Sequence, residues 1–164
     1  MIISVIGGEE SPAEALALAE EVGRELGRRG VTVCCGGGGG VMEAACRGAR
    51  SAGGHTIGIM PGRNAVDNPP NPFVEFAVFT GIGYARNPAV VLTGEAVIAI
   101  AGSYGTLSEI AYALIHDVPL VGLDTWDFDY HGHDGDRILR ATTPLEAVEK
   151  AIDMAERGRS GATK

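Results

Sequence analysis

Residues 96–115 read AVIAIAGSYGTLSEIAYALI, and this stretch decides the fold. It begins with a continuous apolar run, residues 96–100, which is typical of a strand buried on both faces of a parallel sheet. A glycine-containing turn follows at residues 101–105, and apolar residues then recur at helical spacing. The stretch therefore predicts a strand, a tight turn and a helix. The N-terminus of that helix directs unpaired backbone N–H groups at one spot beyond the strand, where an anion such as phosphate would bind.

The same alternation covers the rest of the chain. Apolar runs predict further strands over residues 1–6, 31–35, 55–60, 73–79 and 119–123. Helices are predicted over residues 11–30, 41–53, 80–92 and 143–156, and Pro88 indicates either a kink or a late helix start at Asn87. We expect one domain, residues 1–164, with a frayed tail over 157–164. Its fold class is α/β: a Rossmann-like, doubly wound parallel sheet of six or seven strands with helices on both faces.

Composition excludes several classes of function. The formal net charge of −8 and an aromatic content of 5% argue against a nucleic-acid binder, which needs cationic and stacking side chains. The apolar N-terminal run has no basic segment before it and is too short for a signal peptide or a membrane span. Cys34, Cys35 and Cys46 form an odd set without paired spacing, which favours free thiols in a reducing cytoplasm.

Glycine-rich turns follow four of the predicted strands. They lie at residues 7–8, 36–40, 80–83 and 102–105, and therefore meet at the C-terminal edge of the sheet, where such folds bind ligands. The turn at 36–40 lacks the spaced G-x-G-x-x-G pattern and its acidic ribose partner, so NAD binding is poorly supported. Five consecutive glycines favour close approach of a ligand to the backbone over a merely permissive turn. Residues 61–72, rich in proline and asparagine, predict an irregular loop over the crevice.

Two charged residues near these turns each allow two interpretations. Thr106-Leu107-Ser108-Glu109 fits a capping box, in which Glu109 would only bind the Thr106 N–H; alternatively, the Glu109 carboxylate faces a ligand. Arg86 is either a surface residue or salt-bridge partner, or a clamp for phosphate or carboxylate that points into the crevice.

Three motifs, in this order, resemble the LOG-type proteins, which are cytokinin-activating nucleoside 5′-monophosphate phosphoribohydrolases once labelled lysine decarboxylases. They are GGGGGVME at residues 36–43, Ala-Arg-Asn at 85–87 and G-x-x-G-T-x-x-E at 102–109. The Val-Met-Glu-Ala and Ala-Arg-Asn forms look closest to the molybdenum-cofactor carrier-like branch. The resemblance covers about residues 1–123.

In that family, the residues that match Arg86 and Glu109 are the catalytic pair. The resemblance implies that Arg86 orients the substrate and that Glu109 stabilises an oxocarbenium-like sugar or activates water. The motifs and turns together predict these ligand- and phosphate-binding residues: Gly7, Gly8, Gly37, Gly38, Gly39, Gly40, Met42, Gly81, Gly83, Asn87, Gly102, Ser103, Tyr104, Gly105 and Thr106. The hydrolase motif usually begins Pro-Gly-Gly, whereas this chain has Ala101-Gly102-Ser103, and Asn87 stands where lysine is usual.

Two functions remain open at this point. One is hydrolysis of the N-glycosidic bond of a nucleoside 5′-monophosphate, and the other is a non-catalytic carrier of a phosphorylated ligand such as a nucleotide or molybdenum cofactor. Neither needs a further cofactor, and the expected partner is a small nucleotide- or pterin-type molecule rather than nucleic acid or a membrane. A lysine decarboxylase is excluded, because the only lysines, Lys150 and Lys164, lie far from the glycine edge. The resemblance also implies a homodimer or homotetramer, formed through residues 84–92 or 110–115.

Residues 124–136 are rich in aspartate and histidine. His131 and His133 could ligate zinc, but the segment has no cysteine and no helix to set the geometry. We therefore predict a solvated polar loop and no bound metal.

Overall fold

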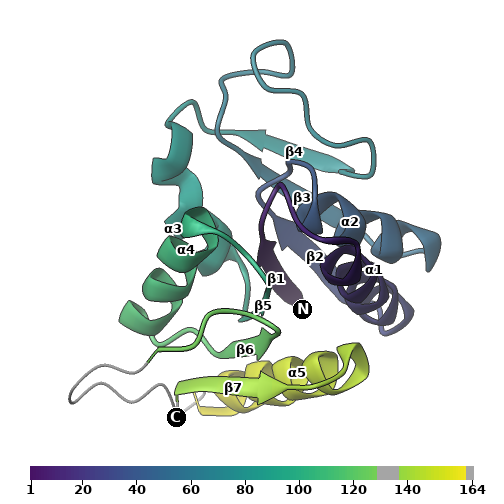
Figure 1. The fold of residues 1–164 in the computed structure, drawn as a ribbon, viewed down its shortest axis with the longest axis vertical. Helices are drawn as coiled ribbons and strands as arrows, with labels where there is room; N and C mark the ends of the chain where they lie inside the picture. The colour runs from purple at the N-terminus through teal and green to yellow at the C-terminus, as the bar shows by residue number, and fades with distance from the viewer. Residues whose placement is uncertain (129–136, 162–164) are drawn as a thin grey trace.

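The fold is a single parallel sheet between two layers of helices (Figure 1). The structure, a computed structural model, describes residues 1–128 and 137–161. Its strands lie in the order β4-β3-β2-β1-β5-β6-β7, and every neighbouring pair is parallel. Their bounds are β1 (Ile2–Gly7), β2 (Thr32–Cys35), β3 (Thr56–Met60), β4 (Phe76–Phe79), β5 (Ala96–Ile100), β6 (Leu120–Leu123) and β7 (Ile138–Ala141). This confirms the predicted Rossmann-like α/β class.

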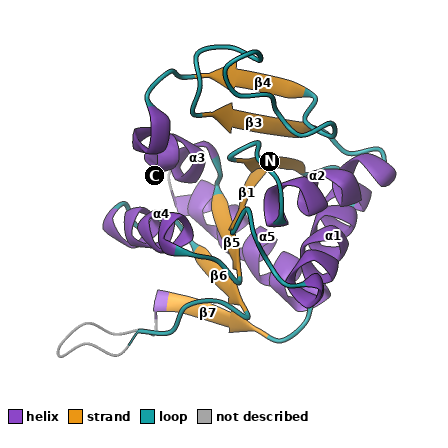
Figure 2. Cartoon of the chain, turned by 45° about the horizontal axis from the view of Figure 1, so that its top comes forward, coloured by secondary structure: helices purple, strands orange, loops and turns teal. Residues whose placement is uncertain are grey.

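Helices cover both faces of the sheet (Figure 2). They are α1 (Ala13–Arg28), α2 (Val41–Ser51), α3 (Asn87–Thr93), α4 (Tyr104–Ile115) and α5 (Pro144–Gly161), with a 3₁₀ turn, η1 (Gly83–Arg86), before α3. Alternate residues of β5 enter opposite cores: Ile98 packs with α1, α2 and α5, whereas Val97 packs with α3 and α4. The continuous apolar run of β5 is therefore explained by burial on both faces.

The topology fixes where a ligand can bind. From β1 the chain builds outward through β2, β3 and β4, then returns to β5 on the other side of β1. The turns after β1 and β5 thus run to opposite faces and leave a crevice at their C-terminal ends. Two of the glycine turns singled out in the sequence lie at this point.

Three details differ from the sequence prediction, and the structure decides between the two alternatives stated for Pro88. Strand β4 begins at Phe76 rather than at residue 73, and it forms the exposed edge of the sheet. Strand β7 was not located in the sequence. Helix α5 continues to Gly161, so residues 157–161 are helical where we expected a frayed tail. Proline 88 does not kink a longer helix, because α3 begins late, at Asn87, as one of the two alternatives stated.

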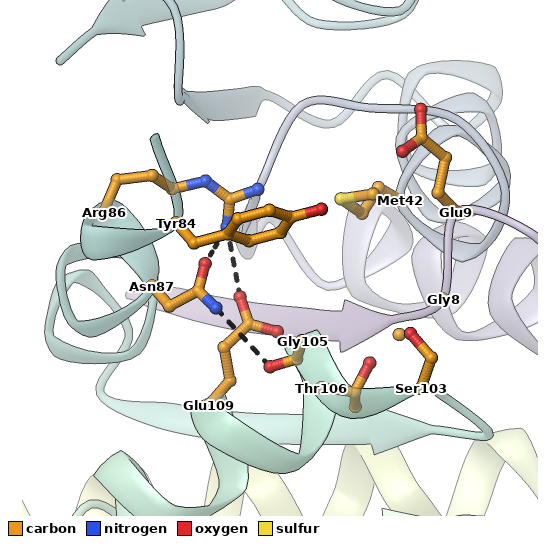
Figure 3. Close-up of a pocket in the computed structure, with 11 residues that line it drawn as sticks. Gly8, Glu9, Met42, Tyr84, Arg86, Asn87, Ser103, Gly105, Thr106 and Glu109 are labelled. Atoms are coloured by element: carbon orange, nitrogen blue, oxygen red, sulfur yellow. Dashed lines mark hydrogen bonds and ion pairs between the residues drawn. The ribbon is translucent and has the colours of Figure 1, made fainter. Parts of the chain in front are cut away.

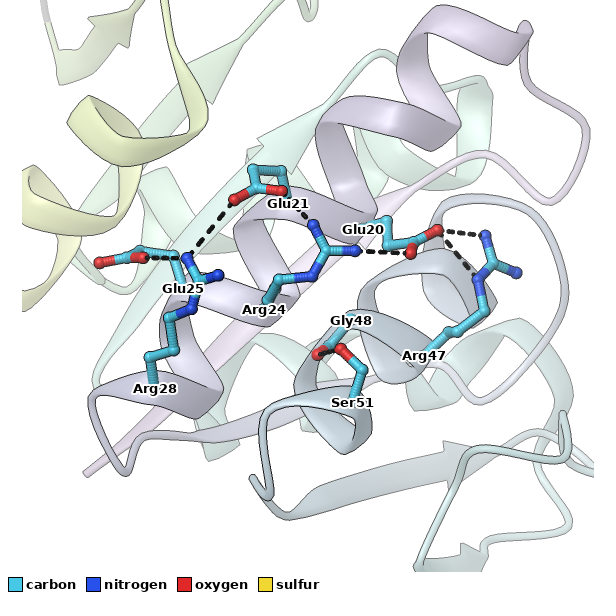
Figure 4. A network of polar contacts seen from close by, with 8 residues as sticks. All are labelled: Glu20, Glu21, Arg24, Glu25, Arg28, Arg47, Gly48 and Ser51. Carbon is cyan, nitrogen blue, oxygen red and sulfur yellow. Dashed lines mark hydrogen bonds and ion pairs between the residues drawn. The ribbon is translucent and has the colours of Figure 1, made fainter.

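Helices α1 and α2 touch through their backbones. A Cβ on Gly48 of α2 would lie 1.9 Å from the Glu20 carbonyl oxygen of α1, and a Cβ on Gly23 would lie 2.0 Å from the Ala45 carbonyl oxygen. Around this contact, the Glu20 carboxylate accepts hydrogen bonds from Arg24 of its own helix and from Arg47 of α2 (Figure 4). The two helices are thus joined by a close glycine contact inside and by ion pairs outside.

Among the described residues, no helix is both long and apolar enough to cross a membrane. Cys34, Cys35 and Cys46 are free and buried, as expected.

Candidate functional site

A cavity of about 110 Å³ opens at the C-terminal edge of β1 and β5 (Figure 3). The turn after β1, the start of α2, η1 with the start of α3, and the first two turns of α4 each contribute to its wall. The lining residues are Gly7, Gly8, Glu9, Met42, Tyr84, Arg86, Asn87, Ser103, Gly105, Thr106 and Glu109.

An ion pair between Arg86 and Glu109 lies at the inner wall of the cavity. Arg86 Nη1 donates to Glu109 Oε1 at 3.2 Å, and the two residues are 9% and 6% exposed. Arg86 is therefore not a surface residue: it is a buried salt-bridge partner of Glu109 that also lines the cavity. The capping interpretation of Glu109 is wrong, because α4 begins at Tyr104 and its N-cap is Ser103, which leaves Thr106 inside the helix.

The environment of Glu109 changes its acidity. Burial raises the pKa of the Glu109 carboxyl to about 7, and the lowering effect of the Arg86 guanidinium offsets only part of this. A carboxyl group with a pKa near neutral pH can accept or donate a proton during a reaction, which an ordinary glutamate at pH 7 does poorly.

Asn87 joins this pair to the first turn of α4. Its Oδ1 accepts from Arg86 Nη1 at 2.9 Å, and its Nδ2 donates to Ser108 Oγ at 2.8 Å. Ser108 Oγ in turn donates to the Gly105 carbonyl oxygen at 2.7 Å. The amide therefore orients the guanidinium relative to the turn that faces the cavity.

The N-terminus of α4 forms another part of the cavity wall. No side chain caps it, so its first N–H groups are available to a ligand. Thr106 is 2% exposed, yet its Oγ1 has no hydrogen-bond partner. Orphaned buried polar groups of this kind are costly unless a ligand or water satisfies them. Together with the positive end of the helix dipole, an unpartnered hydroxyl and uncapped N–H groups are chemically suited to an anion such as phosphate.

The turn before α4 has an unusual backbone. Ala101 has φ 46° and Gly102 has φ 110°, both in the region that favours glycine. Proline is fixed near φ −65°, so it could not replace Ala101 in this conformation. The usual Pro-Gly-Gly motif would place proline at position 101, and a chain with that proline could not form this turn.

The structure brings most predicted site residues to this cavity, but not all. Gly38 and Gly83 line a neighbouring cavity, and Tyr104, 82% exposed, lines a shallow depression on the outer side of α4. Five predicted glycines line none of these three cavities: Gly37, Gly39, Gly40, Gly81 and Gly102. All of them except Gly39 have a positive φ angle, which shapes the turns.

Sequence reasoning missed Glu9 and Tyr84 as lining residues. Glu9 directly follows the first glycine turn, and Tyr84 lies two residues before Arg86. Their nearness to those motifs was the available signal.

The Asp/His segment is only partly described. Asp127 is exposed and bound to Arg140 Nη2 at 2.8 Å, whereas His131 and His133 lie outside the described residues. Within the part of the chain that the structure covers, no three His, Cys, Asp or Glu side chains are grouped so that they could hold a metal ion.

Comparison with known proteins identifies a family that this chain matches. The SLOG cluster4 family model matches residues 1–151. An uncharacterized protein of Archaeoglobus fulgidus is 40% identical over 70% of this chain and 74% of its own length. A cytokinin riboside 5′-monophosphate phosphoribohydrolase of Mycobacterium tuberculosis is 32% identical over 70% of this chain, and the match spans 65% of that enzyme.

A similar solved structure is that of a molybdenum cofactor binding protein from Rippkaea orientalis. It is 32% identical and superposes with a TM-score of 0.80 over 96% of both chains. The resemblance predicted from the three motifs, to LOG-type hydrolases and to the carrier branch, is thereby confirmed.

Proposed function

The chain belongs to the SLOG cluster4 family, and from this premise we propose that it binds a phosphorylated nucleotide or pterin-type ligand at the Arg86–Glu109 site. As the leading reaction we propose hydrolysis of the N-glycosidic bond of a nucleoside 5′-monophosphate. The observation that carries both is a buried Arg–Glu pair that lines the same cavity, of about 110 Å³, as an uncapped helix N-terminus.

The phosphate binds at the N-terminus of α4. There the N–H groups of the first turn and Thr106 Oγ1 supply hydrogen bonds, and the helix dipole supplies positive potential. A Cβ on Gly105 would meet nothing within 4 Å, which leaves room for a phosphate against the backbone.

The reacting bond then lies beside Arg86 and Glu109. In the reaction, the bond between the sugar C1′ and the base nitrogen breaks, the base leaves with that electron pair and takes up a proton, and a water oxygen bonds to C1′. Ionised Glu109 takes the proton of the attacking water and offsets the positive charge that develops on the sugar. Arg86 orients the substrate through hydrogen bonds to its oxygens, and Asn87 holds the guanidinium in position.

The second candidate is a non-catalytic carrier that uses the same site. Two observations favour it: the positive φ of Ala101, which excludes the proline of the hydrolase motif, and Asn87 in place of lysine. The Rippkaea protein, described as binding molybdenum cofactor, matches along nearly the whole chain. Under this proposal the cofactor is cargo, and its phosphate occupies the same helix N-terminus. The three free cysteines support a reducing compartment, the cytoplasm, for either function.

The two functions are separated by release of free base from adenosine 5′-monophosphate and related nucleotides. If the protein is a hydrolase, wild type releases base, and Glu109→Gln still binds nucleotide but loses at least roughly 100-fold in rate, because glutamine is no base. Arg86→Ala lowers both binding and rate.

If the protein is a carrier, wild type releases no base but binds a phosphorylated ligand that Arg86→Ala binds poorly. Turnover that survives Glu109→Gln would remove Glu109 from the mechanism. We expect weak or absent turnover on common nucleotides, because of the changes at positions 87 and 103.

A further inference from the structure

A second cavity, of about 220 Å³, lies against the far side of Arg86 from the N-terminus of α4. The two cavities are adjacent, because both are lined by Glu9, Met42, Tyr84 and Arg86. The rest of its wall is made by Gly36 and Gly38 of the turn after β2, by Pro61 and Asn68 of the loop after β3, and by Gly83. The sequence predicted Gly38, Met42 and Gly83 of this wall as ligand-binding residues, but neither the motifs nor the comparisons say which part of a ligand lies here.

Two buried polar atoms on its lining residues have no partner. Arg86 Nε, a donor, and Asn68 Oδ1, an acceptor, are both buried and lack a hydrogen bond. Arg86 uses Nη1 for Asn87 and Glu109, and its Nη2 reaches the Gly36 carbonyl oxygen at 3.4 Å, which leaves Nε for something else. A donor and an acceptor without partners, on two residues of one cavity wall, match a ligand edge that offers an acceptor beside a donor.

The loop that carries Asn68 is held in place. Asn71 Nδ2 donates to the carbonyl oxygens of Gly37 and Gly38, at 3.2 and 2.9 Å, and the Asn71 N–H donates to Gly37 O at 2.9 Å. The backbone N–H of Asn68 donates to the Asn64 carbonyl oxygen at 3.2 Å. Asn68 is thus carried on a segment fixed to the glycine turn, as a residue that selects a ligand must be.

Two glycines of the turn after β2, Gly36 and Gly38, lie on the opposite wall, each in close contact with a side chain. A Cβ on Gly36 would lie 2.3 Å from Arg86 Nη2, and a Cβ on Gly38 would lie 2.9 Å from the Met42 methyl group. The absence of side chains at these two positions lets the Arg86 guanidinium and the Met42 methyl group pack against the turn, and a flat molecule in the cavity contacts these two side chains.

Resting on the proposed function, we infer that this second cavity holds the planar heterocycle of the phosphorylated ligand, and that Asn68 selects a ring edge with a hydrogen-bond donor next to an acceptor. Purine bases with an amino or lactam group have such an edge, and so does a pterin. The phosphate then lies at α4, the ring lies under the glycine turn, and the bond between ring and sugar lies at Arg86 and Glu109, where both cavities meet.

The role of Asn68 is tested with two nucleotides that differ by one donor: adenosine 5′-monophosphate and purine riboside 5′-monophosphate, which lacks the amino group. Calorimetry, with chromatography to confirm intact nucleotide, should show wild type preferring the first by about tenfold, because the second leaves Asn68 Oδ1 unpaired. Asn68→Ala should reduce the preference below twofold, and Asn68→Asp, which keeps an acceptor oxygen, should retain most of it. Equal affinities in wild type, or a preference that survives Asn68→Ala, would overturn the assignment.

The placement of the ring is tested with a matched pair of glycine variants. Gly38→Val fills the second cavity, and Gly105→Val fills the phosphate end; neither glycine has a positive φ, and circular dichroism confirms that each variant is folded. We expect Gly38→Val to weaken adenosine 5′-monophosphate at least tenfold and ribose 5-phosphate, which has no ring, less than twofold. Gly105→Val should weaken both.

The outcomes separate the two proposals. If Gly105→Val abolishes nucleotide binding and Gly38→Val leaves it unchanged, the phosphate site stands and the ring cavity is wrong. If wild type binds neither compound, the proposed nucleotide-binding function fails, and this inference fails with it.

Discussion

At the scale of the residue, Glu109 shows where local pattern stops being informative. The sequence Thr-x-x-Glu is the same whether the glutamate caps a helix or faces a ligand. The choice depends on where α4 begins and on Arg86, a partner 23 positions earlier in the chain. Only the packing of α3 against α4 brings that partner close. Family resemblance named both residues, but their contact with each other was not visible in the sequence.

The raised pKa of Glu109 predicts a stability that falls as pH rises. The folded state binds the Glu109 proton more tightly than the unfolded chain, whose pKa is near 4.5. The resulting stabilisation is complete below about pH 4.5 and is lost as pH rises through about 7. Between these limits, wild type should lose up to about 3 kcal/mol of unfolding free energy relative to Glu109→Gln, which cannot titrate. Urea unfolding of both proteins at several pH values between 4.5 and 8 measures the difference.

Glu10→Gln is the control for this experiment, because Glu10 is exposed in the turn after β1. The free energy of unfolding of this variant, plotted against pH, should run parallel to that of wild type. If the free energy of unfolding of Glu109→Gln also runs parallel to that of wild type across this pH range, burial does not raise the pKa of Glu109.

At the scale of the element, strands with a strong apolar run and helices with a clear period were predictable to within a few residues. Strand β5 lies where the sequence placed it. Strand β7 was missed because Ile138 and Ala141 are buried while the two residues between them are exposed, a pattern with neither strand nor helix period. Strand β4 was predicted too long. It is a short edge strand whose side chains are mostly exposed, so its sequence shows no clear alternation of buried and exposed residues.

Because α1 and α2 are in close contact, we predict that adding one methyl group at Gly48 strongly lowers the stability of the fold. A Cβ on Gly48 would overlap the backbone of Glu20, which cannot move without displacing α1. Gly48→Ala should therefore lower the free energy of unfolding by about 2–3 kcal/mol, despite the better helix propensity of alanine. Chemical denaturation at pH 7 measures this.

The matched control is Gly158→Ala in α5, where a Cβ meets nothing within 4 Å. Here only propensity acts, and stability should rise by up to about 1 kcal/mol. Equal effects of the two substitutions would show that α1 and α2 do not touch at Gly48.

At the scale of the whole molecule, the alternation of strands and helices predicted the edge at which the site lies, because parallel topology brings all strand ends to one side. It could not predict which residues meet there. Glu9, Tyr84 and Asn68 come from three different connections, and only the strand order β3-β2-β1-β5 brings those connections together.

From the exposed apolar side chains on the face formed by α3 and α4, we predict that the protein self-associates. Of the two predicted interface segments, residues 110–115 need a correction, because Ile110 is fully buried in the core. Leu92 and Ile115, however, are 53% and 67% exposed, on two helices that pack together. Apolar side chains of this size on adjacent helices are suited to a symmetric contact with a second copy.

Light scattering at micromolar concentration should therefore give a mass of at least two 16.9 kDa chains. Leu92→Lys combined with Ile115→Lys should reduce it to one chain and leave the circular dichroism spectrum unchanged, because both side chains point away from the core and paired lysines repel across a two-fold axis. Val66→Lys is the control: Val66 is 92% exposed on the loop after β3, outside this face, and its substitution should not change the mass. A single-chain mass for wild type would remove the prediction, and a double variant that stays associated would place the interface on another face.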